Sequence, residues 1–338
     1  MKRPNRNPLS GFYRAMENQE YPIVESYGTD SPSRLYGVAG FRDYIARLES
    51  DRSLNTHLPK SLIRGVGIEA ITRASDRHPE RNEDAYYTLE HNGALAIGVL
   101  DGLGGLPGSE YAARAAAAVS HNFVKQHITQ HMRPGDSTLV LAESLQFANA
   151  AVALENRRHG LYSDLATTAA LASLHIHPDN SGRQYAALAW IGDSRIYHNR
   201  DGQVLYTSLD DSGTSYRRHA HHTKRSVQDF LERTSDSDED FEDRWDDPVL
   251  GDAFMFRNMV GECLDGKNNR LINIATLEVI PGDTIYALTD GITDNLTRSE
   301  IAEMTNVKDL LSASLARSRD EDHPRSKPDD MTAAMIQV

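Results

Sequence analysis

The sequence predicts an α+β fold in which a central β-sandwich of two mostly antiparallel sheets is flanked by pairs of helices. Short apolar segments with strand composition recur along the chain, and turn sequences connect several of them. Two pairs of segments with helical spacing separate groups of these strands. Sheets on the inside with helices on the outside accommodate this order of elements.

In the first half of the chain, β-branched and aromatic residues indicate the strands, and His91-Asn92-Gly93 joins two of them into a hairpin. An alanine-rich stretch with helical spacing then predicts a helix, and a second helix follows it. The expected strands are 66–75, 85–90 and 94–100, and the expected helices are 107–127 and 136–158.

In the second half, the turn sequences 199–202 and 281–283 separate strand-like segments, and two short helices precede the last strand. The expected strands are 167–177, 184–191, 195–199, 203–209, 272–280, 284–290 and 331–338. The expected helices are 297–304 and 306–318.

Two segments differ in composition from the rest. Prolines punctuate residues 1–64, which we expect to be an N-terminal extension, partly disordered at its start or acting as a regulatory arm, with one short helix at 39–50. Residues 210–250 break the strand pattern, and 235–247 contain eight acids and one arginine. We expect an acidic, solvated flap or insertion there, within a domain that spans 65–338.

Composition excludes several classes of protein. The chain has 36 basic and 49 acidic residues, and its net charge of −13 argues against nucleic-acid binding. Its single cysteine, Cys263, excludes an internal disulfide and a zinc ribbon. No apolar run approaches the ~18 residues that a membrane span needs, and the basic N-terminus lacks the apolar region of a secretory signal. We therefore expect a cytoplasmic monomer that binds neither nucleic acid nor membrane.

Acidic residues stand at the ends of five predicted strands, often beside glycine. A carboxylate beside an apolar strand costs free energy unless it is paired or binds a cation. Five such places in one chain predict that the acids converge at one end of the sandwich. Oxygen-rich sites without cysteine suit Mg²⁺ or Mn²⁺. The glycines after two of the acids allow backbone to approach a metal ion closely and allow positive φ at a tight turn. The acids are Glu83-Asp84, Asp101, Asp193, Asp290 with Asp294, and Asp329-Asp330.

These motifs, in this order, resemble those of the metal-dependent type 2C serine/threonine protein phosphatases. The resemblance covers roughly 66–338. It implies a β-sandwich flanked by helices, which agrees with the fold class predicted from the strand and helix patterns. It rests on Arg-Asn-Glu83-Asp84-Ala, Val-Leu-Asp101-Gly-Leu-Gly-Gly, Ala-Thr-Thr168-Ala, Gly-Asp193-Ser-Arg, Leu-Thr-Asp290-Gly-Ile-Thr-Asp294 and Pro-Asp329-Asp-Met-Thr.

The resemblance implies a centre of two Mg²⁺ or Mn²⁺ ions. In it Asp101 bridges both ions, the Gly102 carbonyl binds one of them, and Asp290 and Asp329 bind the first ion directly. The implied reaction is direct hydrolysis of a phosphoserine or phosphothreonine ester in a protein. Its nucleophile is a hydroxide that bridges the metals, and no phosphoenzyme forms.

The resemblance also implies supporting roles for four further acids. Glu83 and Asp84 resemble the pair that holds metal-bound waters, and together with Asp101 and Asp290 they are the expected catalytic residues. Asp193 and Asp294 resemble ligands of the weaker third ion that many members bind.

Two positions depart from the family pattern. Many members have an arginine that binds substrate phosphate where this chain has Pro79, and we expect Arg77 or Arg81 to replace it, with Arg77 favoured. Eukaryotic members have a histidine after Asp-Gly, where this chain has Leu103. The leaving group must then receive its proton from metal-bound water or from another residue.

Three functions remain open on sequence alone. The first is an active phosphatase with phosphorylated proteins as substrates and a cognate serine/threonine kinase as a partner. The second is a catalytically weak or dead binding scaffold, which the missing arginine and the N-terminal extension leave open. The third is a phosphoesterase that acts on a small metabolite.

Overall fold

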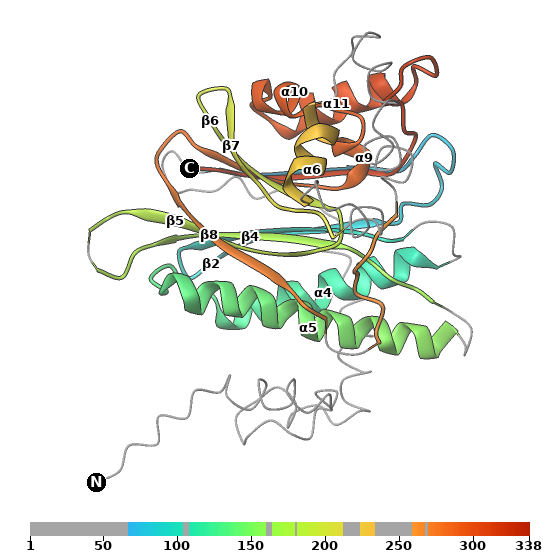
Figure 1. The fold of residues 1–338 in the computed structure, drawn as a ribbon. Coiled ribbons are helices and arrows are strands. Elements are labelled where there is room, and N and C mark those ends of the chain that lie inside the picture. The colour runs from blue at the N-terminus through green and yellow to red at the C-terminus, as the bar shows by residue number, and fades with distance from the viewer. Residues whose placement is uncertain are drawn as a thin grey trace.

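The computed structural model describes residues 67–103, 108–159, 164–179, 181–211, 224–233, 259–267 and 270–338. Within them, two β-sheets stack face to face and helices cover both outer faces (Figure 1). The predicted fold class is confirmed. The expected N-terminal extension 1–64, its helix at 39–50 and the acidic run 235–247 lie outside the described residues.

The elements follow the predicted order closely. The strands are β1 (Gly67–Arg73), β2 (Asp84–His91), β3 (Ala94–Asp101), β4 (Ala169–Ile176), β5 (Gln184–Ile191), β6 (Arg195–Arg200), β7 (Gln203–Thr207), β8 (Asn273–Val279), β9 (Thr284–Leu288) and β10 (Met331–Gln337). The helices are α4 (Ser109–His127), α5 (Pro134–His159), α6 (Lys224–Arg233), α9 (Asp290–Thr293), α10 (Arg298–Glu303) and α11 (Val307–Ser318).

Both sheets are antiparallel throughout. One has the strand order β1-β10-β9-β6-β7 and the other β2-β3-β4-β5-β8. The predicted hairpin turns form as expected, because Asn92 and Gly93 have φ of 50° and 73° and Asp201 and Gly202 have φ of 51° and 72°. Positive φ at both central residues gives a turn whose twist matches that of the two strands it joins.

Because successive side chains of a strand face opposite sides of its sheet, the same strands contribute to two separate hydrophobic cores. In β3, Leu95, Ile97 and Val99 point between the sheets, whereas Ala96 and Leu100 point toward α4 and α5. Successive side chains in a strand face opposite sides, so a strand that is buried on both faces is apolar throughout. A third core lies between the other sheet and the helices α9 to α11.

The helix α5 is long and apolar enough, by length and composition alone, to cross a membrane. However, 72% of its most apolar stretch is buried inside the molecule. It packs against α4, whose alanines allow close approach, and both helices cover the β2-β3-β4-β5-β8 sheet (Figure 1). We interpret α5 as a core helix of the domain.

One expected strand boundary is wrong, and one helix was not predicted. The strand expected over 284–290 ends at Leu288, and Asp290 is instead the first residue of the short helix α9. The chain turns there because the carbonyl of Asp290 accepts the N–H of Asp294 at 2.8 Å. Within the expected flap or insertion 210–250, residues 224–233 form α6, a helix that was not predicted and that buries Val227 and Leu231.

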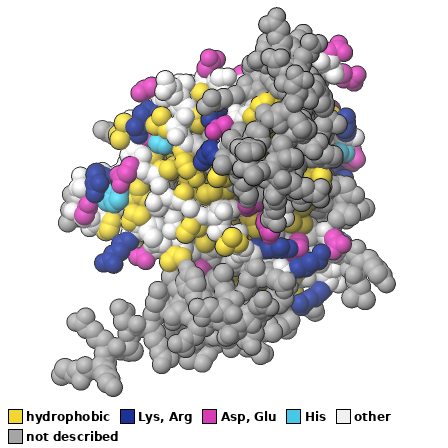
Figure 2. Space-filling model, viewed as in Figure 1, with side chains coloured by type: hydrophobic (Ala, Val, Ile, Leu, Met, Phe, Trp, Pro, Cys, Tyr) yellow, Lys and Arg dark blue, Asp and Glu magenta, His cyan; other side chains and the backbone are white. Residues whose placement is uncertain are grey.

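The edges of the sandwich carry exposed apolar side chains. Leu205 of β7 and Ile274 of β8 are about half exposed, at 50% and 47%. Both strands are sheet edges, and Figure 2 shows hydrophobic side chains gathered on the described part of this face. The alternating burial of β8 reflects packing on one side only.

Candidate active site

Strand ends from both sheets bring the predicted acids together. Leu288, at the end of β9, pairs with Arg195 on one side and with Ala333 on the other. This register places Asp290, Asp193 and Asp329 beyond the same end of one sheet, although 136 residues separate the second from the third. The predicted convergence of these acids follows from the antiparallel pairing.

Asp84 and Asp101 are directly opposite each other in the β2–β3 register. One oxygen of Asp84, Oδ2, accepts a hydrogen bond from Thr289 Oγ1 at 2.9 Å. The other, Oδ1, is buried and has no hydrogen-bond partner among the described residues. The backbone carbonyl of Asp101 accepts the N–H of Thr168 at 2.8 Å, which holds the end of β3 in place.

The glycines beside two of the acids are required by close packing. A Cβ on Gly102 would lie 2.7 Å from the carbonyl oxygens of Glu83 and Ser109, and a Cβ on Gly291 would overlap the carbonyl oxygen of Asp330. Both glycines therefore lie in close contact with protein backbone, whereas the predicted approach of their backbone to a metal ion stays a prediction. The expected positive φ is wrong at Gly102 and Gly291, because neither has φ in the left-handed region.

Lys327 joins three of the acids and was not singled out by the sequence. Its Nζ contacts Oδ2 of Asp290 and lies 3.1 Å from Asp294 Oδ2 and 3.2 Å from Asp329 Oδ2. Burial opposes the charged form, but these three carboxylates hold the pKa of Lys327 well above its usual range. The sequence could have indicated that Lys327 lies near the site, because it stands only two residues before Asp329.

Asp193 is a deeply buried acid of the site. It is 3% exposed, and neither of its carboxylate oxygens has a hydrogen-bond partner among the described residues. Gly192 places it there, with φ of 96° and packing against Thr168 so close that a side chain would not fit. Burial, followed by repulsion from Asp290, raises the pKa of Asp193 well above its usual range.

A second group of side chains lies at the start of β2. Asp330 accepts the backbone N–H of Ser75 and of Glu83, each at 2.6 Å, so it closes the loop 75–83. His78, Glu83 and Asp330 each offer a ligand atom within 4.8 Å of the others and could hold a metal ion. Glu83 and Asp330 are among the acids that the sequence pointed to, whereas His78 was missed, because it is far from Asp330 along the chain.

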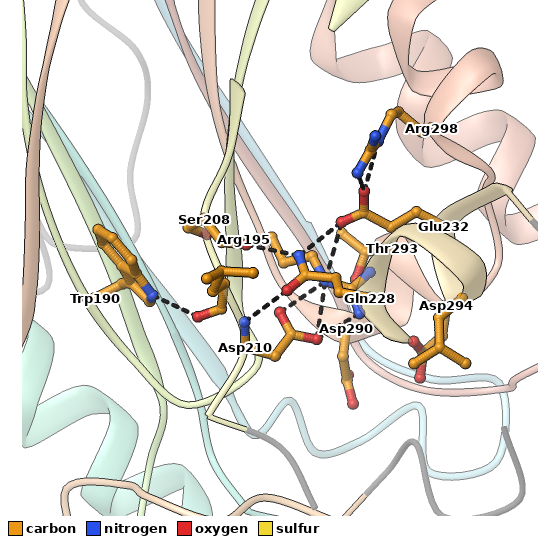
Figure 3. Close-up of polar contacts among 12 residues, drawn as sticks. Trp190, Arg195, Ser208, Asp210, Gln228, Glu232, Asp290, Thr293, Asp294 and Arg298 are labelled. Atoms are coloured by element: carbon orange, nitrogen blue, oxygen red, sulfur yellow. Dashed lines mark hydrogen bonds and ion pairs between the residues drawn. The ribbon is translucent and has the colours of Figure 1, made fainter. Parts of the chain in front are cut away.

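A buried polar network anchors α6 beside the acids. Arg195 Nη2 donates to Asp210 Oδ2 at 2.6 Å, and Gln228 accepts the backbone N–H of Asp210 at 2.9 Å. Gln228 also donates to Glu232 at 2.8 Å, and Glu232 pairs with Arg298 of α10. Figure 3 shows this network next to Asp290 and Asp294. The helix therefore has a defined position relative to the site.

The donor set fits a divalent cation. Asp84 Oδ1, Asp290 Oδ1 and both oxygens of Asp193 are buried without a hydrogen-bond partner among the described residues. Buried carboxylate oxygens are costly unless they are paired or bind a cation. Burial and mutual repulsion also raise the pKa of Asp101 well above its usual range and that of Asp329 to about 6. Hard oxygen donors of this kind suit Mg²⁺ and Mn²⁺.

Comparison with known proteins decides the family. The model of the family "Protein phosphatase 2C" matches residues 74–332, which include every acid of the site. The chain belongs to the protein phosphatase 2C family. By that membership it is a protein serine/threonine phosphatase, as the sequence motifs predicted. No curated protein sequence matches the chain significantly.

Solved structures of three bacterial proteins share the fold. The serine/threonine phosphatase Stp1 from Staphylococcus aureus is 15% identical, with a TM-score of 0.57, and the match covers 84% of this chain and 98% of that one. PstP from Mycobacterium tuberculosis is 20% identical, with a TM-score of 0.54 and coverage of 81% and 98%. PppA from Pseudomonas aeruginosa is 19% identical, with a TM-score of 0.54 and coverage of 80% and 97%.

The two arginines expected to replace the phosphate-binding arginine of the 2C family differ in their surroundings. Arg81 Nη2 lies 3.2 Å from Glu83 Oε1, so its charge is at the site and already paired with an acid. Arg77 is exposed on the loop before it. The role of either side chain in binding phosphate stays a prediction.

Proposed function

We propose that this 2C phosphatase hydrolyses phosphoserine and phosphothreonine in proteins with the aid of two Mg²⁺ or Mn²⁺ ions. The observation that carries the proposal is a set of four buried carboxylate oxygens that have no hydrogen-bond partner within the described part of the chain, contributed by Asp84, Asp193 and Asp290. They converge from three strand ends, and a folded chain retains such a set at a cost in stability.

The proposed ligands come from both sheets. Asp101 and the Gly102 carbonyl reach the site from the end of β3, whereas Asp290 is the first residue of α9 and Asp329 lies in the loop before β10. When bound, two such ions activate water toward phosphorus and neutralise charge on the phosphoryl oxygens. A structure of PstP, which shares the fold, was solved with two manganese ions, and this supports the same cofactor here.

The remaining residues of the site would position the ligands and the substrate. Thr289 orients Asp84 by donating to Oδ2, which leaves Oδ1 directed away from that bond. Glu83 and Asp84 would hold waters around the ions, and Asp193 with Asp294 would bind a third. Arg81 or Arg77 would contact the phosphate of the substrate.

The proposal is tested by the rate of hydrolysis of a phosphothreonine peptide and of p-nitrophenyl phosphate, with Mn²⁺ and with a chelator. Asp101→Asn and Asp290→Asn keep the shape of the side chain and remove its charge. We expect each to lower the rate at least about 100-fold, because a metal ion supplies several kcal/mol of transition-state stabilisation. The matched control is Asp201→Asn, which makes the same change in an exposed turn.

The same assays distinguish a protein phosphatase from a binding scaffold and from a metabolite phosphoesterase. A protein that binds Mn²⁺ and a phosphopeptide without turnover would be a binding scaffold. Faster hydrolysis of sugar phosphates or nucleotides than of phosphopeptides would indicate a metabolite phosphoesterase. Turnover that persists unchanged in the chelator, or in both variants, would contradict the proposal.

A further inference from the structure

Backbone hydrogen bonds fix the position of Lys327, whose side chain points toward Asp290, Asp294 and Asp329. Its backbone N–H donates to Asn295 Oδ1 at 3.0 Å, and its carbonyl accepts from Asn295 Nδ2 at 2.8 Å. Asn295 is fully buried, and it also donates to the carbonyl of Gly291 in α9. The loop that carries Lys327 is thus fastened to the helix that carries Asp290 and Asp294.

The ammonium group bonds to oxygens that a divalent ion would need. Its three partners, Oδ2 of Asp290, Asp294 and Asp329, come from two separate segments, and the lysine side chain is only 11% exposed. An ammonium carries three donors and one positive charge, so it can satisfy three carboxylates at once. Oxygens engaged in these bonds are not free to bind an ion.

Other carboxylate oxygens of the site are not bonded to Lys327. Asp290 uses Oδ2 for the lysine, while its Oδ1 and both oxygens of Asp193 have no hydrogen-bond partner among the described residues. The ammonium therefore neutralises one side of the acidic cluster and leaves the other side uncompensated. An ion on that second side would share the Asp290 carboxylate with the lysine, so the two cations would compete for its negative charge.

We propose that Lys327 is a built-in cation of the metal centre, which holds Asp290, Asp294 and Asp329 together in the ion-free protein and competes with divalent ions for them. This inference rests on the proposed function, since it requires that the acids bind ions. Two consequences follow. Uptake of a divalent ion requires partial displacement of the ammonium, and the ion-free fold depends on the lysine for its stability.

The test measures Mn²⁺ binding by isothermal titration calorimetry and the thermal unfolding temperature in a chelator. Lys327→Met and Lys327→Gln remove the charge, and the glutamine keeps a hydrogen-bond donor in case the methionine variant does not fold. Lys267→Met is the matched control, because it removes one positive charge from an exposed ion pair with Asp164. We expect the two Lys327 variants to bind Mn²⁺ at least about tenfold more tightly, to unfold at a lower temperature in chelator and to gain more from added Mn²⁺.

The outcomes distinguish this inference from the proposed function. If wild type and variants bind Mn²⁺ with the same affinity, or if the Lys327 variants bind it more weakly, the competition is refuted and the metal centre stands. If no form of the protein binds Mn²⁺ at millimolar concentration, both proposals are overturned. An equal gain in affinity in Lys267→Met would show an effect of net charge and would also refute the role of Lys327.

Discussion

Substitution of Arg195 by methionine tests how the network beneath α6 is stabilised. Arg195 and Asp210 are 4% and 5% exposed, and three hydrogen bonds of 2.6–3.1 Å join them. Glu232 lies 3.9 Å from the same guanidinium. Methionine keeps much of the side-chain volume but leaves the Asp210 carboxylate buried without its cation, which typically costs about 3–5 kcal/mol.

The loss of unfolding free energy in Arg195→Met is expected to depend on pH. Burial, only partly offset by Arg195, raises the pKa of Asp210 to about 6 from its usual 3.8. The wild-type fold therefore loses stability through this group as the pH rises from about 4 to 6, and no more above that. Without the guanidinium the pKa rises further, so the variant continues to lose about 1.4 kcal/mol per pH unit above 6. Between pH 6 and 7.5 its deficit grows by about 2 kcal/mol.

Urea unfolding of wild type and Arg195→Met at pH 6 and pH 7.5 measures this deficit. The double variant Arg195→Met/Asp210→Asn is the control, because it no longer contains the titrating carboxyl group. Its difference from wild type should change little over the same pH range. A deficit in the single variant that is the same at both pH values, or smaller than about 1 kcal/mol, would refute the reasoning.

Three further predictions concern other parts of the molecule. Gly291→Ala places a Cβ on the carbonyl oxygen of Asp330 and should cost about 2–3 kcal/mol in urea unfolding and abolish phosphatase activity; wild-type activity would contradict this. Although burial opposes it, hydrogen bonds from Arg200 and His198 hold the pKa of Asp283 below its ordinary value, so wild type should lose stability as the pH falls below about 4. Asp283→Asn should lose about 2–3 kcal/mol at pH 7 and lack that acid-dependent loss, measured by thermal unfolding from pH 3 to 7. Arg81→Ala should raise KM for a phosphothreonine peptide about tenfold with a smaller change in kcat, measured by steady-state kinetics. An equal change in Arg77→Ala would indicate that both arginines contact the substrate. Unchanged kinetics in both variants would exclude both arginines from substrate binding.

Most of the fold could be predicted because the relevant signals are local. The strand 184–191 was predicted with its observed bounds, and the two hairpin turns follow from Asn92-Gly93 and Asp201-Gly202. Element ends were less predictable where a tertiary contact ends the element. The strand β9 ends at Leu288 because the next residue, Thr289, is the N-cap of α9, and its carbonyl accepts the N–H groups of Ile292 and Thr293.

The candidate site was predicted as a set of acids but not as an arrangement. Asp101, Asp290 and Asp329 were found from their positions beside strands, which is a property of the sequence. The position of Asp330 differs, because its two oxygens hold the loop 75–83 through backbone N–H groups about 250 residues earlier in the chain. Nothing in its immediate neighbours along the chain indicates that contact.

The sequence by itself determined the antiparallel sandwich and the end of it at which the acids gather, because alternation and strand boundaries are properties of neighbouring residues. Only the tertiary structure decided which charges meet. It brought Lys327 to three carboxylates, and it placed α6 on the buried pair of Arg195 and Asp210. Electrostatic interaction depends on distance and burial in space, and neither quantity can be obtained from separation along the chain.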